Sequence, residues 1–196
     1  MTACDPKRSF QSIYLSANML FRNHLSNDRS AIVQLFSQVF SDSEGEAEGA
    51  SIEKLTVNLF ETSDDRDLYN FVADDSGQLI GSIFLTRLTL EGSGEVFMMA
   101  PVAVHSDFQG QGVGQALIEF GLGELKHVGV RFVVTYGDPA FYSKVGFRHI
   151  SDEAVRPPFQ LSQPEGWLGL SLTGSPIQDF AGSCACVPAF RDAAYW

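Results

Sequence analysis

The sequence predicts a single domain of mixed α/β class. Apolar runs typical of strands alternate with segments of helical periodicity, and one glycine-rich run joins a strand directly to a helix. The chain has 196 residues, of which 44% are hydrophobic, so it can bury one core of ordinary size without disulfides or a metal. We expect residues 1–16 to be a loose lead-in and residues 17–196 to form the domain.

A strand and two helices are predicted in the first third of the chain. The strand covers residues 20–25, after which Asn27 or Asp28 can cap the first helix. The acidic, glycine-bearing residues 41–49 should form a mobile loop between the helices, because a charge run is most often solvated. The apolar positions at helical spacing are Ile32, Leu35, Phe36, Val39 and Phe40 in the first helix, and Ile52, Leu55, Leu59 and Phe60 in the second.

Three strands should follow, and the third should be central in its sheet. Residues 68–73 and 78–90 flank a turn at residues 74–77, as expected for a hairpin. Residues 95–104 form a continuous apolar run, which indicates burial on both faces. This pattern predicts a strand with neighbours on either side.

Pro101 conflicts with a regular central strand, because proline lacks the N–H group that the ladder requires. The sequence therefore predicts a bulge, or a strand that splays from its neighbour and leaves ladder groups free. A ligand that carries amide groups could then pair with the backbone of Val102, Ala103 and Val104.

The glycine-rich run after this strand is the most informative motif. Glycines between a strand and a helix allow a ligand to approach the backbone, whose N–H groups and helix dipole favour an anion. The motif predicts a pyrophosphate site, although most glycine clusters are only turns. It consists of Gln109, Gly110, Gln111, Gly112, Val113 and Gly114.

The C-terminal part is predicted to hold two helices and three strands. A helix over residues 112–128 ends at Gly129, and a β-branched run follows it. Asp138 and Pro139 are typical of a helix start, and Gly146 of a helix end. The expected elements are strand 131–136, short helix 140–145, and strands 167–172 and 181–187.

Charge and hydropathy exclude some partners. The formal net charge is −11 and the sequence pI is about 4.6, which disfavours nucleic acid because its phosphates require a basic face. The acidity favours a cationic substrate, or it only keeps the protein soluble. The sequence shows no signal peptide and no apolar run long enough to cross a bilayer, so we expect a cytoplasmic protein that does not bind membranes, as a monomer or homodimer.

The cysteines and histidines give no metal or disulfide signature. The three cysteines lack framework spacing, so we expect reduced thiols. Cys184 and Cys186 alternate on one face of a predicted strand and are interpreted as small buried residues. The four histidines are scattered without ligand spacing, and no metal is expected.

Two motifs together resemble the GNAT superfamily of acyl-CoA-dependent N-acyltransferases. The glycine run with its preceding strand is similar to the family's Gln/Arg-x-x-Gly-x-Gly/Ala signature, and residues 137–147 resemble its aromatic-rich motif that ends in Gly-Phe. The order and separation of the two blocks also match. The resemblance covers residues 69–150, and residues 137–142 and 157–160 look most like the YhbS-like branch.

The resemblance implies the fold, the cofactor and the site. It implies a mixed, mostly antiparallel sheet with a splayed, bulged central strand and flanking helices, and acetyl-CoA as co-substrate for an amine acceptor. Backbone groups of residues 109–114 would hold the pyrophosphate, and those of Val102 and Val104 would pair with the pantetheine arm. Tyr142 would be the general acid that donates to the departing thiolate.

A general base is also expected. A protonated amine must lose a proton before it attacks a thioester, so a carboxylate is expected nearby. Glu95 lies close to where some family members keep a glutamate. The alternative interpretation is that Glu95 is only a solvent-exposed carboxylate at the end of a strand. His105 and Asp107 lie too near the pyrophosphate turn to be better candidates.

Two other functions remain open from the sequence. One is a nucleotide-binding oxidoreductase, but the dinucleotide fingerprint requires glycine where Gln115 stands. The other is an acyl-CoA-binding module that regulates a partner without turnover. The acceptor amine is not determined, because the segments expected to recognise it are the least distinctive parts of the chain.

Overall fold

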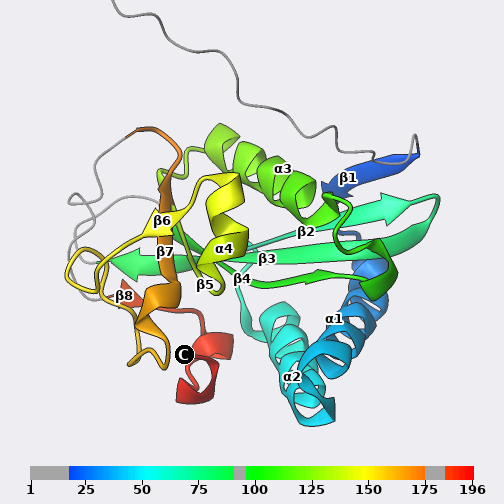
Figure 1. The fold of residues 1–196 in the computed structure, drawn as a ribbon, viewed down its shortest axis with the longest axis horizontal. Helices are drawn as coiled ribbons and strands as arrows, with labels where there is room; N and C mark the ends of the chain where they lie inside the picture. The colour runs from blue at the N-terminus through cyan, green and yellow to red at the C-terminus, as the bar shows by residue number, and fades with distance from the viewer. Residues whose placement is uncertain (1–17, 91–95, 175–183) are drawn as a thin grey trace, which may run out of the picture.

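The protein forms one twisted sheet with helices on both faces (Figure 1). The computed structural model describes residues 18–90, 96–174 and 184–196. The strand order is β1-β2-β3-β4-β5-β7-β6, β8 pairs with β3, and every pair is antiparallel except β4 with β5. This confirms the predicted fold class. The strands are β1 Met19–Asn23, β2 Leu68–Asp75, β3 Gln78–Leu90, β4 Val96–Val104, β5 Phe132–Tyr136, β6 Arg148–His149, β7 Trp167–Ser171 and β8 Cys184–Ala185.

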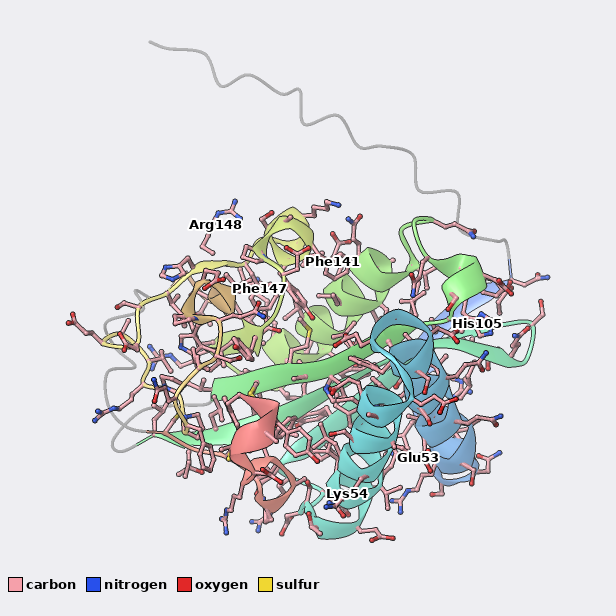
Figure 2. The ribbon with its side chains drawn as sticks, turned by 60° about the horizontal axis from the view of Figure 1, so that its bottom comes forward. Glu53, Lys54, His105, Phe141, Phe147 and Arg148 are labelled. Atoms are coloured by element: carbon pink, nitrogen blue, oxygen red, sulfur yellow. The ribbon has the colours of Figure 1, made fainter. Side chains whose placement is uncertain are left out.

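The helices divide the core into two layers. α1 and α2 cover one face of the sheet and α3 covers the other, while α4 lies beside α3 at the edge of the site (Figure 1). Glu53 and Lys54 lie on the outer, exposed face of α2 (Figure 2). The helices are α1 Arg29–Glu44, α2 Glu46–Thr62, α3 Val113–His127 and α4 Pro139–Tyr142, with short 3-10 helices η1 Ser26–Asp28, η2 Ser106–Phe108, η3 Ser143–Val145, η4 Pro164–Gly166, η6 Pro188–Phe190 and η7 Ala193–Tyr195.

The prediction of a mobile loop at residues 41–49 is wrong. α1 continues to Glu44 and α2 begins at Glu46, so Gly45, with a φ of 100°, alone separates the two helices. A Cβ at Gly49 would lie 2.7 Å from the Ser37 carbonyl oxygen, so the missing side chain allows a close helix crossing. The glycines and acidic residues that predicted a loop have other roles here. Gly49 permits the close contact between the helices, and the acidic side chains lie on their solvated outer face.

β4 confirms both predictions made for it, its central place and its irregularity at Pro101. Ala100 and Pro101 lie opposite the single residue Phe84 of β3, which is a bulge. The parallel pairing with β5 covers Val96 to Met99 and stops there. Beyond Met99 the two strands diverge, and we call the opening between them the fork.

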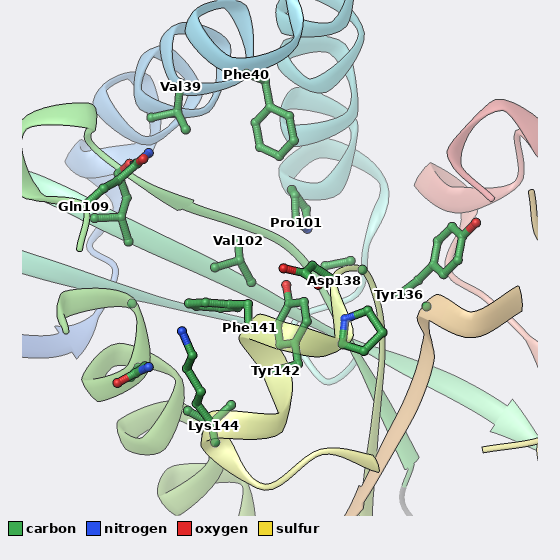
Figure 3. Close-up of a pocket in the computed structure, with 18 of the residues that line it drawn as sticks. Val39, Phe40, Pro101, Val102, Gln109, Tyr136, Asp138, Phe141, Tyr142 and Lys144 are labelled. Atoms are coloured by element: carbon green, nitrogen blue, oxygen red, sulfur yellow. The ribbon is translucent and has the colours of Figure 1, made fainter. Parts of the chain in front are cut away.

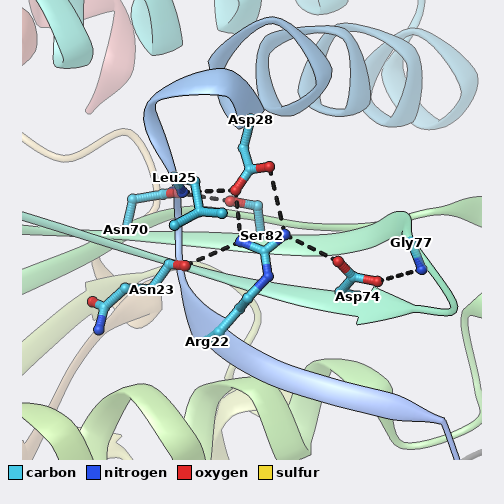
Figure 4. Close-up of polar contacts among 8 residues, drawn as sticks. All are labelled: Arg22, Asn23, Leu25, Asp28, Asn70, Asp74, Gly77 and Ser82. Carbon is cyan, nitrogen blue, oxygen red and sulfur yellow. Dashed lines mark hydrogen bonds and ion pairs between the residues drawn. The ribbon is translucent and has the colours of Figure 1, made fainter.

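A network of charges joins β1 to the rest of the domain (Figure 4). Arg22 donates to Asp28 at 2.6 Å and to Asp74 at 3.0 Å, and Asp28 also accepts the Leu25 N–H at 2.7 Å. Burial acts to raise the pKa of Asp28, but the hydrogen bonds from Arg22 and Leu25 outweigh it and lower that pKa. The network ties the edge strand to the start of α1 and to the hairpin of β2 and β3.

The C-terminal part differs from the sequence prediction in two places. β6 was not predicted, because two residues are too few to show a pattern. Of the predicted strand 181–187, residues 181–183 lie outside the described residues, and Cys184 pairs with Leu90 of β3. Burial raises the pKa of the Cys184 thiol to about 12, which keeps it protonated.

At the other end of the chain, the predicted lead-in, residues 1–16, also lies outside the described residues.

Two further features bear on possible partners. No helix in the described part of the chain is long and apolar enough to span a membrane. Over residues 18–90, 96–174 and 184–196, no group of three or more His, Cys, Asp or Glu side chains is placed to hold a metal ion.

Candidate active site

A groove of about 2210 Å³ runs along the fork (Figure 3). One wall comes from α1 and α2, with Val39 and Phe40 directed toward it, and the opposite wall comes from α4, with Phe141 and Tyr142. The floor includes Pro101 of β4. The divergence of two strands therefore produces a cavity at the centre of the sheet, where polar backbone is exposed between apolar walls.

The free edge of β4 faces this groove. The His105 N–H donates to the Ile80 carbonyl of β3 at 2.8 Å, so by antiparallel alternation the backbone groups of Val102 and Val104 point away from β3, toward the fork. The Val104 carbonyl accepts from the Gln109 side chain at 2.9 Å. Val102, and the N–H of Val104, are therefore the groups best placed to pair with a ligand.

The glycine run turns β4 into α3 at one end of the groove. Gly110 and Gly112 have φ of 72° and 85°, a region that residues with a Cβ rarely adopt, and Gly112 occupies the N-cap of α3 without a side-chain cap. The Gln111 side chain donates to the Asp107 carbonyl at 2.8 Å, which braces the turn internally. The first N–H groups of α3 are thus presented to the groove by backbone alone.

Gly114 is the point where three elements meet. A Cβ there would lie 3.3 Å from Val104 and 3.4 Å from the Phe141 ring, so β4, α3 and α4 converge on it. Lys144 lines the groove on the α3 side, and Arg148 lines its rim and projects into solvent (Figures 2 and 3). These are the two cations among the described lining residues, and both follow α4 in the chain.

Tyr142 lies in the middle of the groove, held by its neighbours. Asp138 caps α4 by accepting the Ala140 N–H at 2.8 Å, and this fixes the short helix that carries the tyrosine. The Tyr142 ring packs on Gly137, where a Cβ would lie 2.8 Å away, and against Phe141 with ring centroids 5.0 Å apart. Its position is therefore determined by packing that does not involve the hydroxyl.

The surroundings of Tyr142 keep its hydroxyl protonated. Burial raises the pKa of Tyr142 to about 12, a hydrogen bond with the Thr135 side chain acts in the opposite direction, and the negative charge of Asp138 raises it further. A phenol with this pKa can donate a proton but does not lose one to water at neutral pH.

The far end of the groove was not found from the sequence. It lies between α1, α2, the loop before β7 and the C-terminal 3-10 helices, and we call it the carboxylate-lined end. Burial raises the pKa of Tyr195 there, and the charges of Asp192 and Glu48 act in the same direction. Its lining residues share no motif, because they come from three separate segments of the chain: Phe40, Glu44 and Glu48 around the junction of α1 and α2, Glu165 before β7, and Tyr195 with Trp196 in the C-terminal segment.

The structure brings most of the sequence-predicted site residues to this one groove. Ala103 is the exception among the described ones, because its side chain is buried against the core and only its backbone takes part in β4. Glu95, the predicted base, lies outside the described residues. The predicted site residues that line the groove are Val102, Val104, Gln109, Gly110, Gln111, Gly112, Val113, Gly114 and Tyr142.

Comparison with known proteins gives one family. The acetyltransferase (GNAT) domain matches residues 66–149. The uncharacterized N-acetyltransferase YhbS of Escherichia coli K12 is 35% identical over 139 residues, which cover 70% of this chain and 78% of that protein. The uncharacterized N-acetyltransferase YjhQ of the same strain is 30% identical over 129 residues, covering 63% and 71%.

Solved structures show the same fold. The E. coli YhbS structure in complex with CoA matches with a TM-score of 0.75 at 28% identity and covers 89% of this chain and 93% of that one. A GNAT acetyltransferase from Brucella melitensis in complex with acetyl-CoA matches with a TM-score of 0.64 at 24% identity, covering 88% and 97%. With its forked sheet, its glycine turn before α3 and these relatives, the chain belongs to the GNAT family of N-acetyltransferases.

Proposed function

We propose that the protein transfers an acetyl group from acetyl-CoA to a primary amine by direct attack in a ternary complex. The observation that carries this proposal is the continuous groove, which joins an anion-binding turn to a protonated phenol and then to a carboxylate-lined end. Each part corresponds to one portion of the reaction: the coenzyme phosphates, the thioester and the amine.

The coenzyme would lie along the fork. Backbone N–H groups of residues 109–114 would bind the pyrophosphate, with Lys144 adding positive charge beside it. The pantetheine arm carries amide groups, which can pair with the exposed backbone of Val102 and Val104 as an additional strand would. The similar fold of E. coli YhbS, whose structure is in complex with CoA, supports coenzyme binding by this protein.

Chemistry would take place where β4 and β5 separate. The neutral amine attacks the thioester carbonyl, the C–S bond breaks, and the sulfur leaves with the electron pair. The nitrogen, positively charged after the attack, gives one proton to the general base or to water. Tyr142 would give its hydroxyl proton to that sulfur, because it lies in the middle of the groove and is protonated before the reaction. Coenzyme A is thereby released as a neutral thiol and not as a thiolate.

The carboxylate-lined end favours a positively charged acceptor. Glu44, Glu48 and Glu165 line it, whereas Lys144 and Arg148, the lining cations among the described residues, lie on the side of α3 together with one carboxylate, Glu119. Aromatic rings of Phe40 and Tyr195 add surfaces that attract cations. An amine with a second positive charge would therefore bind better than one with a neutral chain.

A thiol-release assay with acetyl-CoA and a panel of amines tests the activity and the acceptor together. We expect diamines to have higher kcat/KM than monoamines of equal length, and Glu48→Gln to reduce that preference by roughly fivefold, since an exposed ion pair contributes up to about 1 kcal/mol. Glu53→Gln is the matched control, because Glu53 lies on the outer face of the same helix (Figure 2).

Three results, from this assay and from cofactor titration, would contradict the proposal. Coenzyme binding without thiol release for any amine would favour a non-catalytic acyl-CoA-binding module. Tight binding of a nicotinamide cofactor in place of CoA would favour the oxidoreductase. Equal effects of Glu48→Gln and Glu53→Gln would remove the carboxylate-lined end from acceptor recognition.

For the general base we propose Glu95. Glu95→Gln removes the charge and keeps the shape, so the variant should lose rate most at low pH and partly recover as the pH rises, because more of the acceptor is then neutral. A pH–rate profile measured with saturating acetyl-CoA tests this. A profile parallel to that of the wild type over the whole range would exclude Glu95 as the base.

A further inference from the structure

Tyr136 connects the fork to the loop that precedes β7. It is the last residue of β5, and its ring is directed away from Tyr142 (Figure 3). Its hydroxyl accepts the Gln163 N–H at 2.7 Å and forms a second hydrogen bond, at 2.9 Å, with the Ser162 hydroxyl. A tyrosine hydroxyl can donate one proton and accept another at the same time, so both bonds can exist together. One side chain of β5 therefore holds the start of the loop formed by residues 162–166.

The end of this loop is fixed by the same strand. The Gly137 N–H donates to the Gly166 carbonyl at 3.0 Å, and the Gly166 N–H donates to the Gln163 carbonyl at 2.9 Å. A Cβ at Gly166 would lie 3.2 Å from the Tyr136 ring and 3.0 Å from the Gly137 carbonyl oxygen, so the loop packs on the ring as closely as a glycine allows. The loop is thus fastened at both ends, and Pro164 restricts its backbone between them.

Glu165 lies between the two fastened ends and lines the carboxylate-lined end of the groove. Its backbone is therefore held in place by contacts that Glu165 does not make itself. The attraction between a carboxylate and a bound cation falls with distance and with the access of water and salt. A loop that moved away from the groove would weaken this attraction without altering the thioester or the coenzyme.

We propose that Tyr136 is a positioning residue for the acceptor, whose hydroxyl holds the 162–166 loop so that Glu165 meets the second positive charge of a diamine. This inference rests on the proposed acetyl transfer and adds to it how the acceptor is placed. Asp138 caps α4, which carries Tyr142, whereas Tyr136, two residues earlier, holds the loop. The end of one strand therefore sets the separation between the proton donor and the site of the amine.

Tyr136 could instead serve only the sheet, because it pairs with Trp167 where β5 and β7 end. Loss of that role would lower the stability of the domain, or the rate with every amine alike. A positioning role predicts a loss that depends on the charge of the acceptor and disappears once Glu165 carries no charge. Comparison of acceptors and double-mutant analysis therefore separate the two roles.

Tyr136→Phe keeps the ring that packs on Gly166 and removes the hydroxyl. With diamines, we expect KM to rise by roughly fivefold, the effect of one lost hydrogen bond, while kcat and the coenzyme Kd stay within about twofold of the wild type. With monoamines of equal length, KM should change by less than about twofold, because they carry no second charge for Glu165 to attract. In the Glu165→Gln background, Tyr136→Phe should cause no further rise in the KM for diamines. Tyr69→Phe is the matched control, because it removes a tyrosine hydroxyl from β2, outside the groove.

Hydrogen exchange tests the held loop without reference to turnover. The Gln163 N–H loses its acceptor in Tyr136→Phe, so amides of residues 162–166 should exchange faster than in the wild type. Amides of residues 102–104, on the opposite side of the fork, should exchange at the wild-type rate. Tyr69→Phe should leave the exchange of the loop unchanged.

Several results would overturn the inference. They are an unchanged KM for diamines in Tyr136→Phe, an equal rise for monoamines and diamines, a further rise in the Glu165→Gln background, and unchanged exchange of the loop. A Glu165→Gln variant with the wild-type KM for diamines would also count against it, while the acetyl transfer itself would stand. Absence of thiol release with any amine would instead refute the proposed function, and this inference with it.

Discussion

Gly112→Glu should abolish coenzyme binding. Gly112 is the N-cap of α3, with a φ of 85°, and a side chain there would enter the end of the groove that presents backbone N–H groups. A carboxylate at about 4 Å from a phosphate is repelled by about 4 kcal/mol at an effective dielectric constant of about 20, or roughly 10³-fold in affinity. Calorimetric titration with CoA measures this directly.

Two controls separate charge from backbone strain. Gly112→Gln has the same size and the same strained φ but no charge, so it should bind CoA more tightly than Gly112→Glu by a large factor. Gly77→Glu introduces the same residue at a φ of 91° in the hairpin between β2 and β3, where a Cβ meets open space, and should bind CoA normally. Equal affinity for wild type and Gly112→Glu would disprove the phosphate site.

Tyr142→Phe should lower kcat by roughly 10²-fold, since assistance by a general acid contributes about 10²- to 10⁴-fold. The ring contacts with Gly137 and Phe141 are kept, so the coenzyme Kd should hardly change. Because burial raises the pKa of Tyr142 to about 12, the wild-type rate should not fall between about pH 7 and pH 10, the ordinary pKa of tyrosine, through loss of this proton.

Tyr136→Phe is the matched control for this experiment. Tyr136 ends β5 and lines the same groove, but its hydroxyl is engaged with Ser162 at 2.9 Å and with the Gln163 N–H at 2.7 Å. We expect it to alter acceptor KM more than kcat. Single-turnover measurements that show equal rates for wild type and Tyr142→Phe would remove Tyr142 from the mechanism.

Elements with a strong local pattern were predicted well. β3 was bounded correctly as Gln78–Leu90, and α3 and β5 agree with prediction to within one residue at each end. Their signals are local, because turn glycines and a period of two or of 3.6 residues lie within each segment. The irregularity of β4 was also predicted, since the missing N–H of Pro101 is a property of one residue.

The residues 41–49 were misread because composition does not show what a glycine packs against. Gly49 packs closely against Ser37 and Ser41 of α1, and that contact exists only after both helices have docked.

The sequence by itself determined the fold class, the family resemblance and the half of the groove that binds through backbone. That half is encoded in one continuous segment, residues 101–114, where glycines and Pro101 dictate local geometry. Only the tertiary structure decided the other half. The junction of α1 and α2 with Glu44 and Glu48 lies far in the chain from Glu165 and Tyr195. These residues line one groove because α1, α2 and the C-terminal segment close over the sheet where it opens between β4 and β5.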